Sequence, residues 1–76
     1  MTEVILPELG EGIKHAVVSS WLCKEGDSVQ EGDDIVELVT DKATFNVSAT
    51  TSGILKQILV PEGQDAKIGA PLAVIQ

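Results

Sequence analysis

The chain contains a single cysteine, Cys23, and a single histidine, His15, among its 76 residues. One cysteine cannot form an internal disulfide, and one cysteine with one histidine cannot supply the ligands of a structural zinc site. A lone histidine also leaves no Ser/His or Cys/His pair for nucleophilic catalysis, so we expect His15 at an exposed strand position. The fold must therefore be held by the packing of apolar side chains alone.

Positive charge is also scarce. All five basic residues are lysines, against twelve acids, and the formal net charge is −7. Such a surface repels nucleic acid and anionic lipid, so neither is an expected partner. No apolar run approaches the roughly 20 residues of a membrane span, and Met1-Thr2-Glu3 lacks the basic start of a signal peptide. We therefore expect a soluble domain that begins directly with its fold.

Only two aromatic residues, Trp21 and Phe45, accompany many valines, isoleucines and leucines. This composition indicates a thin aliphatic core, which favours strands in one small domain, with Trp21 buried or half-buried. No segment keeps the 3.6-residue period of an amphipathic helix. Apolar and β-branched runs bounded by turn formers instead predict strands at residues 4–6, 13–23, 35–40, 44–47, 54–60 and 71–75. The predicted fold class is all-β.

The sequence repeats itself after about 37 residues. The matched pairs are Val17-Val18 with Ile54-Leu55, Trp21-Leu22 with Ile58-Leu59, Glu25-Gly26 with Glu62-Gly63, Val29 with Ala66, Gly32 with Gly69, Ile35 with Leu72, and Leu38 with Ile75. Glycines and apolar residues that match over so many positions predict two similar β-halves related by pseudo-two-fold symmetry. The four matched glycines are expected at bends that other residues make only with strain.

A hairpin is predicted at residues 37–47, where two strand-like runs flank the polar pair Asp41-Lys42. The pair lacks the glycine of the tightest hairpins, so we expect a type I turn with the Lys42 ammonium pointing into water. Under the 37-residue shift this turn corresponds to the two chain ends. Lys42 and the termini should therefore lie at opposite ends of the domain. By itself, a lysine on a turn is usually only solvated surface.

Other motifs do not indicate an active site. Gly10-x-Gly12 is not a dinucleotide fingerprint, because His15 stands where the third glycine would be and no helix follows. The acids of residues 25–34 lack the ligand spacing of a calcium loop and are read as turn formers. No pair of groups suits acid-base or nucleophilic catalysis, so a free-standing enzyme is disfavoured, and we predict neither catalytic nor metal-binding residues.

Three segments together resemble the lipoyl domain of the acyltransferase (E2) component of 2-oxo acid dehydrogenase complexes, over essentially the whole chain. They are Pro7-Glu8-Leu9-Gly10-Glu11-Gly12-Ile13, Trp21-Leu22 with Glu25-Gly26-Asp27-x-Val29-x-x-Gly32-Asp33, and Thr40-Asp41-Lys42-Ala43. The resemblance implies a flattened barrel or sandwich of two four-stranded antiparallel sheets. One departure lies just before Asp41. The residues there are Val39 and Thr40, whereas family members often carry an acid nearby, and the nearest acid in this chain is Glu37.

The resemblance also implies a function. Lys42 would be amidated by lipoate, whose dithiolane accepts an acyl group from a thiamine-diphosphate-dependent decarboxylase (E1), presents it for transfer to coenzyme A at the E2 catalytic core, and is reoxidised by the flavoprotein dihydrolipoamide dehydrogenase (E3). A lipoate-protein ligase, or a lipoyl synthase and transferase, would attach the group. Asp41 and Ala43 would be recognition elements, as would the loop formed by Leu9, Gly10, Glu11, Gly12 and Ile13.

Alternatives remain open within the same fold. A biotin carboxyl carrier shares the hairpin lysine, but its lysine lies between methionines, whereas Asp41 and Ala43 flank Lys42 and the only methionine is Met1. The lipoyl carrier of glycine cleavage is a lesser alternative, because it is longer and lacks this amino-terminal loop. We expect residues 1–76 to form a single, monomeric domain at the N-terminus of a larger subunit. The expected location is the bacterial cytoplasm, with the mitochondrial matrix as the alternative.

Overall fold

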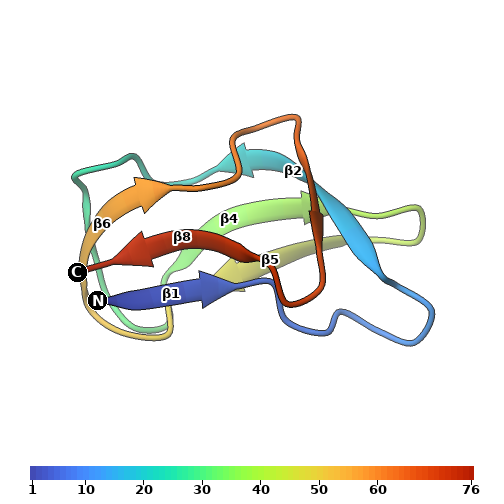
Figure 1. Cartoon of the computed structure of the whole chain (residues 1–76), viewed down its shortest axis with the longest axis horizontal. Coiled ribbons are helices and arrows are strands. Elements are labelled where there is room, and N and C mark those ends of the chain that lie inside the picture. Colours follow the sequence, from blue (N-terminus) through green and yellow to red (C-terminus); the bar gives the residue numbers. More distant parts are fainter.

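Eight β-strands account for the regular secondary structure of a computed structural model that describes all residues, 1–76. They are β1 (Thr2–Ile5), β2 (His15–Trp21), β3 (Ser28–Val29), β4 (Asp34–Val39), β5 (Thr44–Ser48), β6 (Gly53–Ile58), β7 (Asp65–Lys67) and β8 (Pro71–Ile75). They form two four-stranded sheets with the orders β1-β8-β6-β3 and β5-β4-β2-β7, and every pairing is antiparallel. The all-β sandwich is confirmed (Figure 1).

The predicted strands are all present, with corrected boundaries. The strand predicted at 13–23 is β2, which runs from His15 to Trp21, and the strand predicted at 35–40 is β4, which ends at Val39 because Thr40 joins the turn. The strands predicted at 4–6 and 54–60 are β1 and β6, each of which lies slightly nearer the N-terminus. β3 and β7 were not predicted, since strands of two and three residues are too short to show an alternating pattern.

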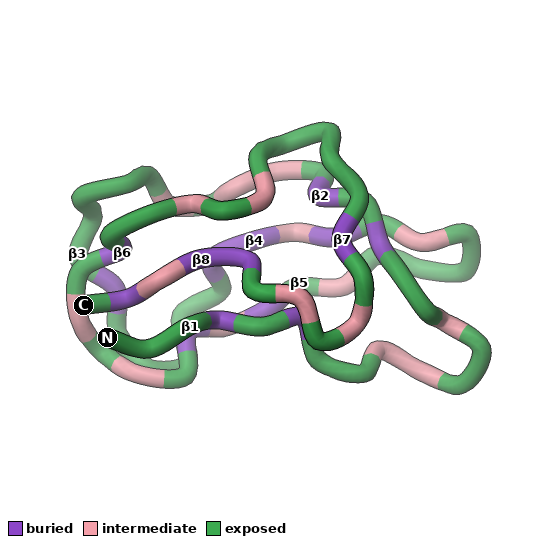
Figure 2. Tube along the Cα trace, in the orientation of Figure 1, coloured by how far each residue is buried: buried purple, intermediate pink, exposed green.

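The core contains 15 buried residues, all hydrophobic, contributed by both sheets. In β2 the buried Ala16 and Val18 alternate with the exposed His15 and Val17, as expected when one face of a strand meets the core. Trp21 packs half-buried against this core. Figure 2 shows the buried positions gathered along the strands and the exposed ones along the connecting loops. No buried polar side-chain atom lacks a hydrogen-bond partner.

The pseudo-two-fold symmetry is confirmed by the order of the strands in the two sheets. The shift of 37 residues carries β2, β3 and β4 onto β6, β7 and β8, and these occupy equivalent places in the two sheets. Hydrogen bonds follow the same relation. Gly26 N donates to Leu55 O at 2.7 Å, and its counterpart Gly63 N donates to Val18 O at 2.8 Å. Both glycines have positive φ, 94° and 86°, so the predicted bends are present.

One connection breaks the symmetry. β1 corresponds to β5 in sheet order, yet residues 6–14 separate β1 from β2, whereas only residues 49–52 separate β5 from β6. The first connection is thus longer by five residues than its counterpart. The two connections lie at opposite ends of the long axis, which measures 32 Å (Figure 1).

The two ends of the long axis differ in what they carry. Both termini lie at one end, where Ile54 N donates to Gln76 O at 2.9 Å. The β4–β5 turn and the connection 6–14 lie at the other end (Figure 1). We call these the terminal pole and the lysine pole. The predicted separation of Lys42 from the termini is confirmed. None of the elements is a helix of the length and apolarity needed to cross a bilayer.

Candidate functional site

The β4–β5 turn, residues 40–43, forms the tip of the lysine pole. Val39 pairs with Thr44 at the end of the ladder, and Thr40 N donates to Ala43 O at 2.9 Å across the turn. No residue other than glycine has positive φ. The primed hairpin turns require positive φ, so they are excluded here, in agreement with the expectation of an unprimed turn.

The side chain of Thr40 holds this turn together. Its hydroxyl donates to Ala43 O at 3.0 Å and accepts hydrogen bonds from Lys42 N at 3.2 Å and Ala43 N at 3.1 Å. A hydroxyl has one hydrogen to donate and two lone pairs to accept with, so its bonding capacity is used entirely within the turn. Sequence reasoning treated Thr40 only as a departure from the family pattern. A hydroxyl residue directly before a polar turn was the signal that could have found it.

Asp41, by contrast, takes no part in holding the turn. Its carboxylate has no hydrogen-bond partner and no ion pair, because the single ion pair of the chain joins His15 to Asp65. Turn formation was the simplest alternative to a recognition role for Asp41. Since Thr40 performs that task, the carboxylate is left exposed and available to a partner.

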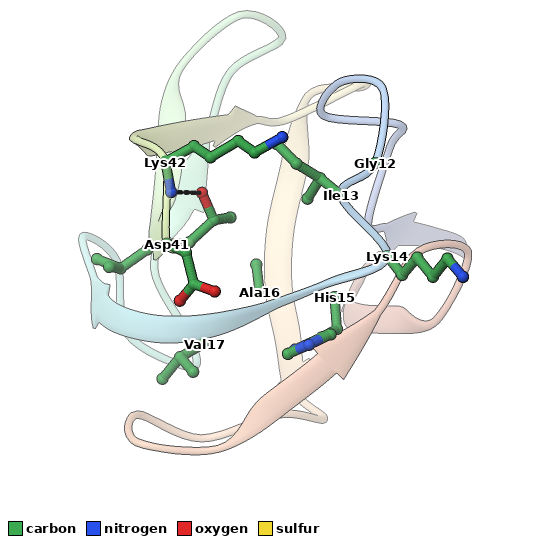
Figure 3. Close-up of a pocket in the computed structure, with 10 residues that line it drawn as sticks. Gly12, Ile13, Lys14, His15, Ala16, Val17, Asp41 and Lys42 are labelled. Atoms are coloured by element: carbon green, nitrogen blue, oxygen red, sulfur yellow. Dashed lines mark hydrogen bonds between the residues drawn. The ribbon is translucent and has the colours of Figure 1, made fainter.

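Lys42 carries an exposed amine that is free of acidic partners. Its Nζ atom makes no ion pair, and the only hydrogen bond of the residue is the one that its backbone N donates to the Thr40 hydroxyl. The side chain does not project straight outward, as the sequence led us to expect, but extends across the lysine pole toward Ile13 (Figure 3). A Cβ atom built on Gly12 would lie 3.6 Å from Nζ. The amine is therefore accessible and lies beside the long connection.

The connection 6–14 is folded back onto the domain rather than extended. Leu9 packs against the core, and Ile13 N donates to Gly10 O at 3.2 Å. Gly12 has φ of 82°, which favours glycine, and Glu11 is exposed at the bend. The structure thus brings Gly12 and Ile13, the end of the predicted recognition loop, beside Lys42. The role of this loop in recognition stays a prediction.

A groove of about 310 Å³ lies between the two segments of the lysine pole. It is lined by residues 12–17 of the connection and β2 and by residues 39–42 of β4 and the turn. Figure 3 shows the Lys42 side chain extending over this space and the Asp41 carboxylate directed toward β2. His15 lies at its edge and contacts Asp65 at 2.7 Å. Both side chains of that pair are exposed, so it contributes little to stability.

Cys23 lies outside the lysine pole. It lines a second, more open groove with Trp21 and Ile58, near the pseudo-two-fold axis. Partial burial, assisted by the charges of Asp27 and Asp33, raises the pKa of the Cys23 thiol. A thiol with a raised pKa is a poor nucleophile at neutral pH, so the structure gives Cys23 a packing role. No group of three or more acidic, histidine or cysteine side chains is arranged to hold a metal ion.

Comparison with known proteins shows the family to which the chain belongs. A family model described as "Biotin-requiring enzyme", which covers biotin and lipoyl domains, matches residues 2–75. The chain belongs to the biotin/lipoyl family. Among curated members, the dihydrolipoyllysine-residue succinyltransferase component of the 2-oxoglutarate dehydrogenase complex of Staphylococcus saprophyticus is 41% identical over 75 residues, which are 99% of this chain and 18% of that protein.

Two further relatives carry similar segments. The dihydrolipoyllysine-residue acetyltransferase component of the pyruvate dehydrogenase complex of Zymomonas mobilis is 39% identical, over 96% of this chain and 17% of that protein. The pyruvate dehydrogenase E1 component subunit beta of Rhizobium meliloti is 38% identical, over 96% of this chain and 16% of that protein. The chain thus spans less than a fifth of the length of these relatives.

Solved structures agree with this assignment. The lipoyl domain of the 2-oxoglutarate dehydrogenase complex of Azotobacter vinelandii has a TM-score of 0.78 at 28% identity, covering 100% of this chain and 96% of that one. A multi-domain long-chain acyl-CoA carboxylase has a TM-score of 0.70 at 25% identity, covering 87% of this chain and 7% of that one. The resemblance to the lipoyl domain is confirmed. By family and fold, the chain is a lipoyl-type domain.

Proposed function

We propose that Lys42 is the attachment point of a lipoyl group, bound through an amide, and that the domain acts as the swinging-arm acyl carrier of a 2-oxo acid dehydrogenase complex. The observation that supports this most directly is the Lys42 amine itself. It is exposed, has no ion pair, and lies between Asp41 and Ala43 on a turn at the pole opposite both termini.

The surroundings of Lys42 suit acylation of its amine. An amine without a carboxylate partner can react without first losing an ion pair. Its four-carbon stem adds reach and rotational freedom to whatever is attached. Formation of an amide removes one positive charge, which changes the formal net charge from −7 to −8 and leaves the acidic surface otherwise as it is.

The chain's contribution to the chemistry is placement. When bound, the dithiolane supplies a disulfide that is reduced and acylated reversibly, which no side chain of this domain can do. The sandwich holds the attachment point about as far from the termini as its 32 Å long axis allows. A carrier tethered at one pole presents its amine at the other, and tethering raises the effective concentration at neighbouring active sites toward the millimolar range.

The partners follow from this role. We propose that the domain is part of a larger subunit, of the acyltransferase (E2) type, that serves a decarboxylase (E1), an E2 catalytic core and a flavoprotein (E3), after modification by a lipoate-protein ligase. Asp41, Ala43 and the segment from Leu9 to Ile13 are the surface proposed to be read by E1 and the ligase. The proposal covers 2-oxo acids as a class, because the relatives serve both 2-oxoglutarate and pyruvate complexes. The proposed location is the bacterial cytoplasm, with the mitochondrial matrix as the alternative.

A biotin carrier is the second candidate, favoured by the similarity to the acyl-CoA carboxylase fold. Two observations favour lipoate. Asp41 and Ala43 occupy the positions that flank the lysine, and relatives with 41% and 39% identity are components named for a dihydrolipoyllysine residue.

The test is intact-mass measurement and peptide mapping after separate incubation with a lipoate ligase and a biotin ligase. We expect a lipoyl adduct on Lys42 alone. Lys42→Arg should abolish it completely while leaving the free energy of unfolding within about 0.5 kcal/mol, because an exposed turn side chain contributes little to stability. Lys24→Arg is the matched change at another exposed lysine, and this variant should still be lipoylated at Lys42 to the normal extent. A biotin adduct without a lipoyl one would establish the second candidate instead.

A further inference from the structure

The turn that carries Lys42 is built differently from the turns at residues 24–27 and 30–33. The turns at residues 24–27 and 30–33 use an aspartate within the turn, since Lys24 N donates to Asp27 Oδ2 at 2.9 Å and Gln30 N donates to Asp33 Oδ2 at 3.0 Å. Each also contains a glycine with positive φ, Gly26 or Gly32. These two turns are therefore closed by the carboxylate of their last residue, with a glycine before it.

The turn at residues 40–43 has neither of these features. It contains no glycine, and its own aspartate, Asp41, accepts no hydrogen bond. Two of its backbone N–H groups, those of Lys42 and Ala43, are bound instead by the hydroxyl of Thr40, the first residue of the turn. The turn is thus fixed from its base, and the side chains of Asp41, Lys42 and Ala43 are all left exposed.

We propose that Thr40 is the positioning residue of the modification site. Its hydroxyl holds the backbone of Asp41-Lys42-Ala43 in one conformation before the modifying enzyme binds, so that the enzyme meets a preformed tip and a free Asp41 carboxylate. This proposal rests on the proposed lipoylation of Lys42. Preorganisation acts by removing the entropic cost of ordering a loop during binding. Loss of the hydroxyl should therefore weaken recognition of the domain more than it slows the reaction of the bound amine.

Four substitutions separate the effect of the hydroxyl from that of the shape of the side chain. Thr40→Val keeps the β-branched outline and removes the three hydrogen bonds, whereas Thr40→Ser keeps the hydroxyl. Thr44→Val makes the same chemical change just beyond the turn, at an exposed hydroxyl that makes no hydrogen bond, and serves as the matched control. Thr40→Ala is a second variant without a hydroxyl, for use if the valine does not fit.

The first measurement is the steady-state rate of lipoylation by a lipoate-protein ligase as the concentration of folded domain is varied. We expect Thr40→Val and Thr40→Ala to raise KM about three- to thirtyfold with kcat changed less than about twofold, because the tip must be ordered on binding. Thr40→Ser and Thr44→Val should keep KM within about twofold of the original domain. An unchanged KM in both variants without the hydroxyl would overturn the proposal.

The second measurement is hydrogen exchange of the unmodified domain. Removal of the Thr40 hydroxyl should accelerate exchange at the Lys42 and Ala43 amides and leave the amides of β2 and β6 unchanged, which separates a local effect from general loosening of the fold. Acceleration spread over all strands would contradict a positioning role. The two proposals fail in different ways. If the unsubstituted domain is not lipoylated at Lys42, the proposed function is refuted. If it is lipoylated but the variants without the Thr40 hydroxyl have the same KM, only the positioning role is refuted.

Discussion

The two poles of this domain are built on the same strands and differ in their connections. At the terminal pole the chain begins and ends, and four residues join β5 to β6. At the lysine pole the equivalent break is closed by the turn at residues 40–43, and the equivalent connection is nine residues long, 6–14. The strands thus provide a symmetric frame, while the features that bear on function come from two loops at one end. The three predictions below, made with five variants, test whether the two poles are independent and whether the frame is symmetric in its energetics.

The largest effect on stability is expected at the terminal pole. A Cβ atom at Gly53 would meet the backbone oxygen of Gln76 and lie 2.9 Å from Cγ2 of Ile75. Gly53→Ala should therefore lower the free energy of unfolding by about 1–3 kcal/mol, as overpacking does. Relief by movement of Gln76 would break its two hydrogen bonds with Ile54. Chemical denaturation measures the loss. Lipoylation of the folded variant should be unchanged, and a fall in its rate would show that the poles are coupled.

A smaller effect distinguishes two glycines, one at each pole. Gly12 and Gly26 have φ of 82° and 94°, so alanine at either should cost about 1 kcal/mol of unfolding free energy from backbone strain. Only at Gly12 would the new methyl group contact another part of the chain, the Nζ atom of Lys42. Gly12→Ala should slow lipoylation and Gly26→Ala should not, as measured by intact mass over time. Equal rates would mean that the Lys42 side chain does not depend on the connection beside it.

The smallest effect tests the symmetric frame itself. Glu25 Oε2 accepts a hydrogen bond from Ile58 N at 2.8 Å, and its counterpart Glu62 Oε2 accepts one from Trp21 N at 3.1 Å. Both carboxylates are exposed, so Glu25→Ala and Glu62→Ala should each cost about 0.5–1 kcal/mol of unfolding free energy. Thermal or chemical denaturation would measure both. Losses that differ by more than about 1 kcal/mol would show that the halves are alike in shape but not in energetics.

The sequence by itself determined the frame of this protein. Apolar and β-branched runs bounded by turn formers predicted the longer strands, and the 37-residue repeat predicted the two halves. Together they placed Lys42 opposite the termini. These features are readable because they depend on residues that are close along the chain or on a pattern that occurs twice. The motifs around Lys42 also identified the family, which the match over residues 2–75 confirms.

The tertiary structure decided the details of the lysine pole. The hydroxyl of Thr40 holds the turn, and the carboxylate of Asp41 makes no hydrogen bond. The Lys42 side chain places its Nζ atom beside Gly12 instead of pointing directly into water. β3 and β7 appeared only as partners of β6 and β2. The contact between Gly12 and Lys42 joins residues that are 30 positions apart in the sequence. It depends on how a loop packs beside a turn, which no local sequence pattern predicts. Strand and repeat patterns therefore fixed where the lysine lies, and packing between distant segments fixed how it is presented.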